Sequence, residues 1–326
     1  NGTISGTDAN LTSSLGVGAL VVQGSTIRLS GTTLSAAGHG FSVATQSGLL
    51  ADMPAEVPDG ATQAVISAAP SAPSANTVLV QGGQITAGAD LVHVEGAVAN
   101  VTISGGAQAS AGSGLLLNAL ASGTVGSQVG FVMDGVSLSG DLAADAASAV
   151  SATLRNSATL TGKIDPVSLD IDGTSRWNMT ANSQLRDLSM ASGALVQVSP
   201  PSGGIFKTLT VQGTLSGAGT VGLNTLLAGD GSPSDKIVIN GGAATGATGL
   251  RIANAGGAGA VTSGNGIQVV DAVNGGMTAP SAFALQSAVV AGPYEYLLYR
   301  GSKDGTSPQA WYLRSEAPPP PPPPPE

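Results

Sequence analysis

The chain has 326 residues, of which 11 are Lys or Arg and 20 are Asp or Glu, so its formal net charge is −9. Charged residues make up only 10% of the chain, against about 25% in an average globular domain, and the lack of any Lys/Arg cluster argues against nucleic-acid binding. The absence of cysteine excludes disulfides and thiolate metal sites.

Short alternating stretches recur along the chain. Each has apolar residues at positions i and i+2 and ends in Gly or Asn, which is typical of a short β-strand followed by a bend. Aromatic residues are only 3% of the chain, so a thick compact core is disfavoured. In chain order, the predicted strands lie within residues 26–31, 78–88, 91–96, 100–106, 129–140, 157–162, 167–173, 176–180, 209–217, 236–241, 250–256 and 267–276.

The spacing of these strands indicates a repeat. VSLSG begins at Val136 and ATLTG at Ala158, while VLVQGG begins at Val78 and VTISGG at Val101. Steps of roughly 20–25 residues that hold two or three short strands suit the coils of a β-helix. Val and Ile would fill the inside of each coil, and Gly and Asn would take the corners that need positive φ.

Two segments depart from this rhythm. Residues 51–76 contain four prolines and little alternation, so we expect a loop insertion that leaves the coils. Such a loop is either a binding element or a tolerated insertion without function. Residues 142–156 are rich in Ala and form the best helical candidate of the chain, but helix signals are nearly absent throughout and a helix is disfavoured here.

The apolar area is concentrated in residues 283–313. All four tyrosines and one of the two tryptophans lie near this end of the chain, and each aromatic ring buries about 150–250 Å². Residues 300–309 can turn the chain so that two strands pair as a β-hairpin. Such a hairpin would cap the open end of the solenoid. The cap candidates are Phe283, Leu285, Gly292, Tyr294, Tyr296, Leu298, Trp311, Tyr312 and Leu313.

The order of features in residues 205–316 carries a resemblance. An L-x-G-x-G stretch is followed by SDKIVING, a Leu-Arg-Ile strand, AFAL, GPYEYLLY and finally WYL. This order resembles the C-terminal end of a pertactin-like autotransporter passenger domain. The fold class that we expect is therefore all-β, a right-handed parallel β-helix that ends in a C-terminal β-hairpin cap.

The resemblance also implies a domain plan and a biological setting. Residues 1–204 would be passenger coils, 205–316 the last coils with an autochaperone cap, and 317–326 a polyproline linker. The linker would lead to the protein's own C-terminal outer-membrane β-barrel, which is absent from this chain. A Gram-negative bacterium would secrete such a protein by type V secretion and display the passenger on its surface or release it after cleavage. The C-terminal region would fold first and template the rest.

Few residues suggest chemistry. GAGTVG at 217–222 has the spacing of a dinucleotide loop, but no convincing helix follows it. His39 and His93 have no Ser or Asp in a suggestive motif. Asp170 and Asp172 would share a strand face, where they could bind calcium or act as an acid/base pair on a sugar, or simply face solvent. We predict no catalytic, cofactor or metal site.

The sequence thus favours an adhesin or virulence factor. It would attach to a host-cell surface protein or glycan, or mediate self-association between bacteria. An enzyme acting on polysaccharides on the same scaffold and a structural stalk are the alternatives.

Overall fold

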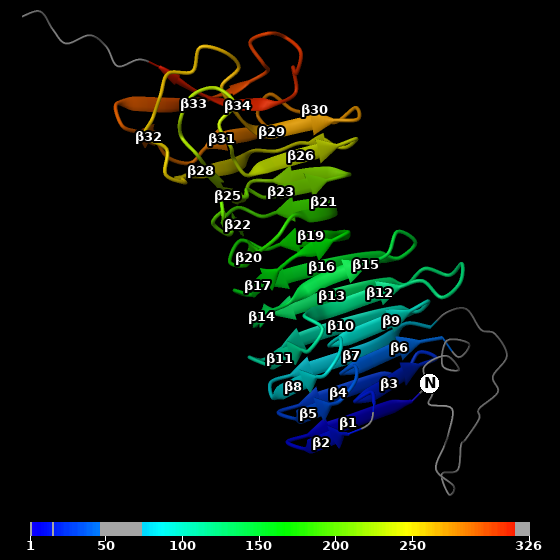
Figure 1. The fold of residues 1–326 in the computed structure, drawn as a ribbon. Coiled ribbons are helices and arrows are strands. Elements are labelled where there is room, and N and C mark those ends of the chain that lie inside the picture. Colours follow the sequence, from blue (N-terminus) through cyan, green and yellow to red (C-terminus); the bar gives the residue numbers. More distant parts are fainter. Residues whose placement is uncertain (1, 15, 46–73, 317–326) are drawn as a thin grey trace, which may run out of the picture. The chain divides into compact units, whose positions relative to one another are not determined.

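A computed structural model describes residues 2–14, 16–45 and 74–316 (Figure 1). This part of the chain contains strands and no helix, so it holds no helical segment that could span a membrane. The chain divides into two compact units, Asn1–Thr153 and Leu154–Glu326. The loop insertion expected at 51–76 and the polyproline linker at 317–326 lie outside the described residues, apart from 74–76.

Unit 1 is built from coils of three short strands. Strands of successive coils pair in parallel and form three ladders: β1–β4–β7–β10–β13, β2–β5–β8–β11 and β3–β6–β9–β12–β15. The strands are β1 (Thr3–Thr7), β2 (Asn10–Ser13), β3 (Ala19–Val22), β4 (Thr26–Ser30), β5 (Thr33–Ala36), β6 (Phe41–Ala44), β7 (Asn76–Gln81), β8 (Gln84–Ala87), β9 (Val92–Glu95), β10 (Val98–Ser104), β11 (Gln108–Ala111), β12 (Leu115–Leu120), β13 (Gln128–Asp134), β14 (Ser137–Ser139) and β15 (Asp141–Ala144).

Apolar residues at alternate positions fill the inside of these coils. Ile27, Val78, Val101 and Phe131 occupy matching positions of β4, β7, β10 and β13 and are all buried. The residue after each of them points the other way, because side chains alternate along a strand. The alternation seen in the sequence therefore corresponds to the inner and outer faces of a coil.

Unit 2 is also built from parallel ladders. One ladder runs β17–β20–β22–β25–β28–β31, and another runs β19–β21–β23–β26–β29. The strands are β16 (Ala149–Arg155, which begins in unit 1), β17 (Thr159–Gly162), β18 (Ile164–Asp165), β19 (Val167–Ile171), β20 (Arg176–Met179), β21 (Ser183–Met190), β22 (Leu195–Val198), β23 (Thr208–Val211), β24 (Thr214–Gly217), β25 (Thr220–Thr225), β26 (Lys236–Asn240), β27 (Ala243–Ala244), β28 (Thr248–Asn254), β29 (Ile267–Val273), β30 (Met277–Thr278), β31 (Phe283–Leu285), β32 (Val289–Ala291), β33 (Tyr294–Arg300) and β34 (Trp311–Glu316).

A single column of side chains shows how the core of unit 2 is continuous. Leu160, Trp177, Val196, Val221 and Leu250 follow one another through five successive strands, and all are fully buried. These parallel ladders confirm the predicted β-helix.

The last three strands pair antiparallel rather than parallel. β32 pairs antiparallel with β33, β33 with β34, and β34 with β29 (Figure 1, orange to red). The predicted C-terminal hairpin is therefore present, with residues 301–310 as its loop.

Side-chain acceptors at the corners join neighbouring coils. Many are carried by the coil nearer the C-terminus and accept a backbone N–H of the coil before it. Examples are Ala121 N–H to Asp145 (2.7 Å), Asn156 N–H to Asp172 (2.7 Å), and Lys207 N–H to Asp235 (2.7 Å). Serine hydroxyl oxygens of the later coil also accept such hydrogen bonds. The Ser127 N–H donates to Ser148 Oγ (2.9 Å), the Ala158 N–H to Ser175 Oγ (3.0 Å) and the Ile164 N–H to Ser183 Oγ (3.2 Å).

Residues 142–156 contain no helix. They belong to β15 and β16, joined by a turn. Val150, Ala152 and Leu154 are buried at period 2, while Ser151 faces outward. Ala favours helices in isolation, but stacking on neighbouring coils outweighs that propensity here.

Candidate functional site

The cap contains most of the residues that the sequence singled out, and Tyr296 is at its centre. This residue of β33 is fully buried. Its hydroxyl accepts a hydrogen bond from the Ala260 N–H (2.9 Å) and lies within donating distance of the carbonyl oxygens of Ala228 (2.9 Å) and Ala260 (3.1 Å). One tyrosine thus links the hairpin to two segments that lie 68 and 36 residues earlier in the chain.

Trp311 forms the second anchor of the cap. Its ring meets that of Phe283 edge-on, with centroids 5.5 Å apart and planes at 75°, which is a favourable aromatic geometry. Its indole N–H donates to Thr278 Oγ1 (3.0 Å), and this hydroxyl donates in turn to the Gln309 carbonyl (2.7 Å). Arg300 also donates to the Thr278 carbonyl (2.8 Å). The hairpin is therefore held to β30 by polar as well as apolar contacts.

The remaining cap candidates differ in burial. Tyr312 and Leu313 are buried, whereas Leu285, Tyr294 and Leu298 are half-buried. Leu285 pairs with Leu250 and so extends the core column into β31. Gly292 has a φ of +55°, and a Cβ there would lie 2.5 Å from the Ala258 carbonyl oxygen.

A buried carboxylate just before the cap was missed by sequence reasoning. Asp235, within the SDKIVING stretch, is fully buried. It accepts hydrogen bonds from the backbone N–H groups of Lys207 (2.7 Å) and Asn224 (2.8 Å) and from Asn224 Nδ2 (2.7 Å). These three donors join β25 and the residue before β23 to the corner before β26.

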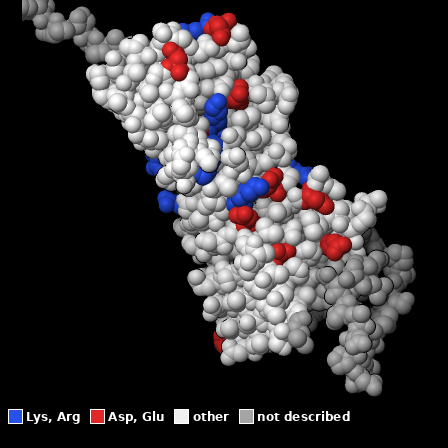
Figure 2. All heavy atoms as spheres, viewed as in Figure 1, with Lys and Arg blue, Asp and Glu red and all other residues white. Residues whose placement is uncertain are grey.

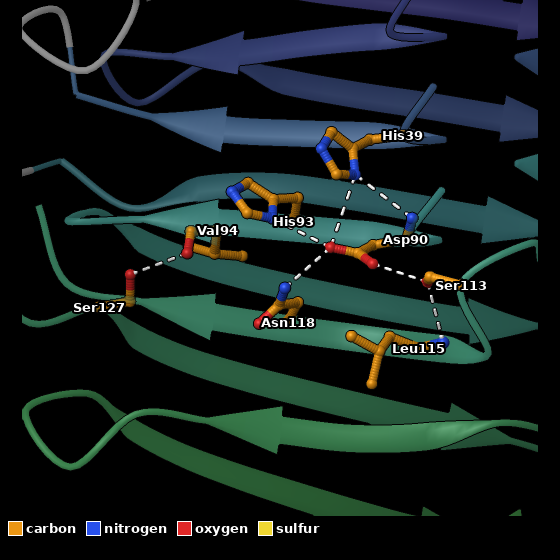
Figure 3. A network of polar contacts seen from close by, with 8 residues as sticks. All are labelled: His39, Asp90, His93, Val94, Ser113, Leu115, Asn118 and Ser127. Atoms are coloured by element: carbon orange, nitrogen blue, oxygen red, sulfur yellow. Dashed lines mark hydrogen bonds and ion pairs between the residues drawn. The ribbon is translucent and has the colours of Figure 1, made fainter. Parts of the chain in front are cut away.

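Unit 1 contains a second polar cluster, formed by His39, Asp90 and His93 (Figure 3). His39 and Asp90 occupy the turns before β6 and β9, and His93 lies on the outer face of β9. Asp90 Oδ2 is 3.1 Å from His93 Nδ1 and 3.6 Å from His39 Nδ1. The two imidazole rings stack with centroids 4.4 Å apart and planes at 21°.

Two further side chains hold the Asp90 carboxylate. Ser113 Oγ donates to Oδ1 (2.7 Å) and Asn118 Nδ2 donates to Oδ2 (2.9 Å). Burial raises the pKa of Asp90, but the hydrogen bonds from Ser113, Asn118 and His93 and the charge of His39 outweigh it, so the pKa lies below its ordinary value. The carboxylate is therefore ionised at neutral pH.

The presence of Ser, His and Asp does not make this cluster a catalytic triad. A triad needs the hydroxyl to donate to the imidazole, which removes its proton. Here Ser113 Oγ donates to Asp90 instead and accepts from the Leu115 N–H (3.2 Å). The hydroxyl is thus held as a support for the carboxylate.

The other chemical candidates are occupied in structural roles. Asp172 directly follows β19 and accepts a hydrogen bond from the Thr174 N–H in the turn there. Asp170 lies within β19 and faces solvent. Burial raises the pKa of Asp172, but hydrogen bonds from Ser175, Asn156 and Thr174 lower it to about 2. The GAGTVG stretch runs from the end of β24 into β25, so a strand rather than a helix follows it.

Comparison with known proteins agrees with these features. A family model described as Autochaperone Domain Type 1 matches residues 183–298, which include Asp235 and Tyr296. The chain is 37% identical over 112 residues to "Autotransporter adhesin AIDA-I" of Escherichia coli, covering 34% of this chain and 8% of the relative.

A longer match, 34% identical over 211 residues, is to "Probable autotransporter YfaL" of E. coli (strain K12), covering 61% of this chain and 16% of the relative.

The chain is thus similar to autotransporter passengers, and residues 183–298 to their autochaperone domain. Passengers of this class are displayed on the bacterial surface or secreted by type V secretion. The chain spans less than a fifth of the length of these two relatives. Among solved structures, the Haemophilus influenzae Hap adhesin is similar with a TM-score of 0.49 and 15% identity, over 90% of this chain and 32% of that one.

Proposed function

We propose that this passenger segment acts as an adhesin, attaching to a host-cell surface protein or glycan or to a second bacterium. The observation that carries the proposal is the similarity to a relative whose name gives adhesion as its role. The surface is compatible with binding by shape and neutral polar groups. On the face viewed in Figure 2, Lys, Arg, Asp and Glu are scattered among neutral residues.

The test compares beads coated with the purified chain and beads coated with the same chain after denaturation. Adhesion predicts that only the folded chain retains beads on cultured cells, immobilised matrix proteins or glycans. Self-association predicts that the beads aggregate with one another and that the sedimentation coefficient rises with protein concentration. Folded beads that bind no cell, matrix protein or glycan, from a chain that stays monomeric, would contradict the proposal.

We also propose that residues 205–316 form a folding nucleus for the preceding coils. The support is the density of buried aromatic and polar contacts around Tyr296 and Trp311, together with the autochaperone match. Large buried rings contribute more stability than the Ala, Val and Thr of an ordinary coil.

The experiment is refolding from denaturant followed by pulsed hydrogen exchange with peptide resolution. The proposal predicts that peptides from 205–316 gain protection before those from unit 1. Earlier protection of unit 1 would refute it.

A further inference from the structure

The His39–Asp90–His93 cluster offers three ligands of the kinds that divalent transition metals use. Each residue presents one ligand atom, and these atoms all lie within 4.8 Å of one another. Imidazole nitrogen combined with a carboxylate oxygen suits Zn²⁺ and its neighbours in the first transition row. These are the only two histidines of the chain, and the fold brings them together.

The spacing matches the shell of a small tetrahedral ion. Bonds of about 2.0–2.1 Å to nitrogen and oxygen place neighbouring ligand atoms about 3.3 Å apart. The separations from Asp90 Oδ2 to the Nδ1 atoms of His93 and His39 are 3.1 and 3.6 Å. The carboxylate–imidazole separations are therefore within a few tenths of an ångström of those in such a shell.

A supporting shell is already in place around the carboxylate. Carboxylate ligands of bound metals are themselves hydrogen-bonded, which fixes their orientation. Ser113 and Asn118 do this for the two oxygens of Asp90 (Figure 3). Both residues belong to the next coil. Ser113 precedes β12, and Asn118 lies within β12.

The site is reachable from outside the coil. His93 lies between Ser42, which is buried, and the half-buried Asn118 in its ladder. The side chains of His39, His93 and Asp90 are 24%, 12% and 7% exposed. A fourth position on the ion would therefore be open to water or to a donor group of a partner.

One movement is required. A metal lies in the plane of an imidazole that binds it, whereas these rings are stacked nearly parallel. Binding must rotate one ring about its Cβ–Cγ bond. His39 is the ring that can turn, because it is the more exposed and sits on a turn rather than within a strand. Its Nδ1 accepts a hydrogen bond from the Asp90 N–H (3.3 Å), and metal binding would replace this bond.

We propose that His39, Asp90 and His93 form a binding site for one Zn²⁺ or similar divalent transition metal, which replaces the sequence expectation of no metal site. The ion would tie two turns whose residues are 51 positions apart in the chain. It supplies, in a chain without cysteine, a reversible cross-link that forms only after folding has assembled the ligands.

The test uses the chain without any affinity-tag histidines, freed of metal by chelation. Isothermal titration with Zn²⁺ alone is expected to show one site per chain, and Co²⁺ is expected to give the intense visible absorption of a tetrahedral ion. His39→Ala and His93→Ala are expected to abolish both signals. Asp170→Asn removes an exposed carboxylate elsewhere and is the matched control, with binding unchanged.

One measurement separates a metal site from a merely structural cluster. Ser113→Ala leaves all three ligands but is expected to weaken Zn²⁺ binding by about 10–100-fold.

The proposal is overturned if the intact chain shows no 1:1 binding, or if the double variant without both histidines still binds. Circular dichroism checks that each variant is folded. The Co²⁺ spectrum needs no variant, so a chain that gives only the octahedral spectrum of free Co²⁺ would overturn the proposal even if the variants misfold.

Discussion

Removal of one oxygen atom, in Tyr296→Phe, tests the role of the cap most directly. The substitution keeps the buried ring and deletes the hydroxyl that accepts from the Ala260 N–H and donates to a carbonyl oxygen. Each lost hydrogen bond removes about 0.5–1.5 kcal/mol, and a buried N–H left without a partner costs about 1–3 kcal/mol. We expect the free energy of unfolding of the C-terminal region to fall by about 1–3 kcal/mol.

The larger change Tyr296→Ala separates the ring from its hydroxyl. Truncating a fully buried aromatic ring costs about 3–5 kcal/mol, and the lost hydroxyl adds to this. The difference between the Ala and Phe variants therefore measures the packing contribution. Tyr294→Phe, the same substitution on a half-buried tyrosine of the same strand, is the control and should shift stability by less than about 0.5 kcal/mol.

The assay is equilibrium unfolding in guanidinium chloride, followed by tryptophan fluorescence and by protease resistance of the C-terminal region. Both tryptophans lie in unit 2, so fluorescence reports on that unit. A lower midpoint at constant slope indicates lost stability. A Tyr296→Phe variant with the same unfolding midpoint as the Tyr294→Phe control would refute the role assigned to the hydroxyl.

Three further changes probe the backbone and the corners. Gly292→Ala should destabilise the cap by about 1 kcal/mol or more, because φ is positive there and the new Cβ would meet the Ala258 carbonyl; an unchanged melting temperature would contradict this. Asp235→Asn places an amide against N–H donors and should cost about 2–4 kcal/mol by denaturant unfolding, whereas wild-type stability would show that the corner tolerates the amide. The lowered pKa of Asp172 stabilises the fold above its ordinary value of 3.8, and this contribution is lost as the pH falls toward about 2. Asp172→Asn should thus be less stable than the parent at pH 7, with the gap closing over that window in urea titrations; a gap that persists at the acid end would refute the linkage.

Local patterns were sufficient for the architecture. A coil interior requires little more than apolar residues at alternate positions, so stretches such as TIRLSG and VTISGG identified β4 and β10. The hairpin could be predicted because the aromatic residues are concentrated in β33 and β34. The Ala-rich segment 142–156 was harder to assign, since Ala favours a helix locally and only its stacking on neighbouring coils makes it part of two strands.

Long-range contacts could not be predicted in the same way. The only local signal for the His39–Asp90–His93 cluster is the D-x-x-H spacing of Asp90 and His93. The position of His39 depends on the length of chain between successive coils, which no local pattern specifies. Asp235 was missed for a similar reason, because its donors belong to other strands.

The corner acceptors tie neighbouring coils in both directions along the chain. At the corners of Asp145, Asp172 and Asp235, the acceptor is on the later coil and the N–H donor on the earlier one. At the corners of Asn182, Asp187 and Asp230, the acceptor is on the earlier coil and the N–H donor on the later one. Neither end of the stack therefore carries all the acceptors, and loss of one corner side chain leaves an N–H of a neighbouring coil without its partner.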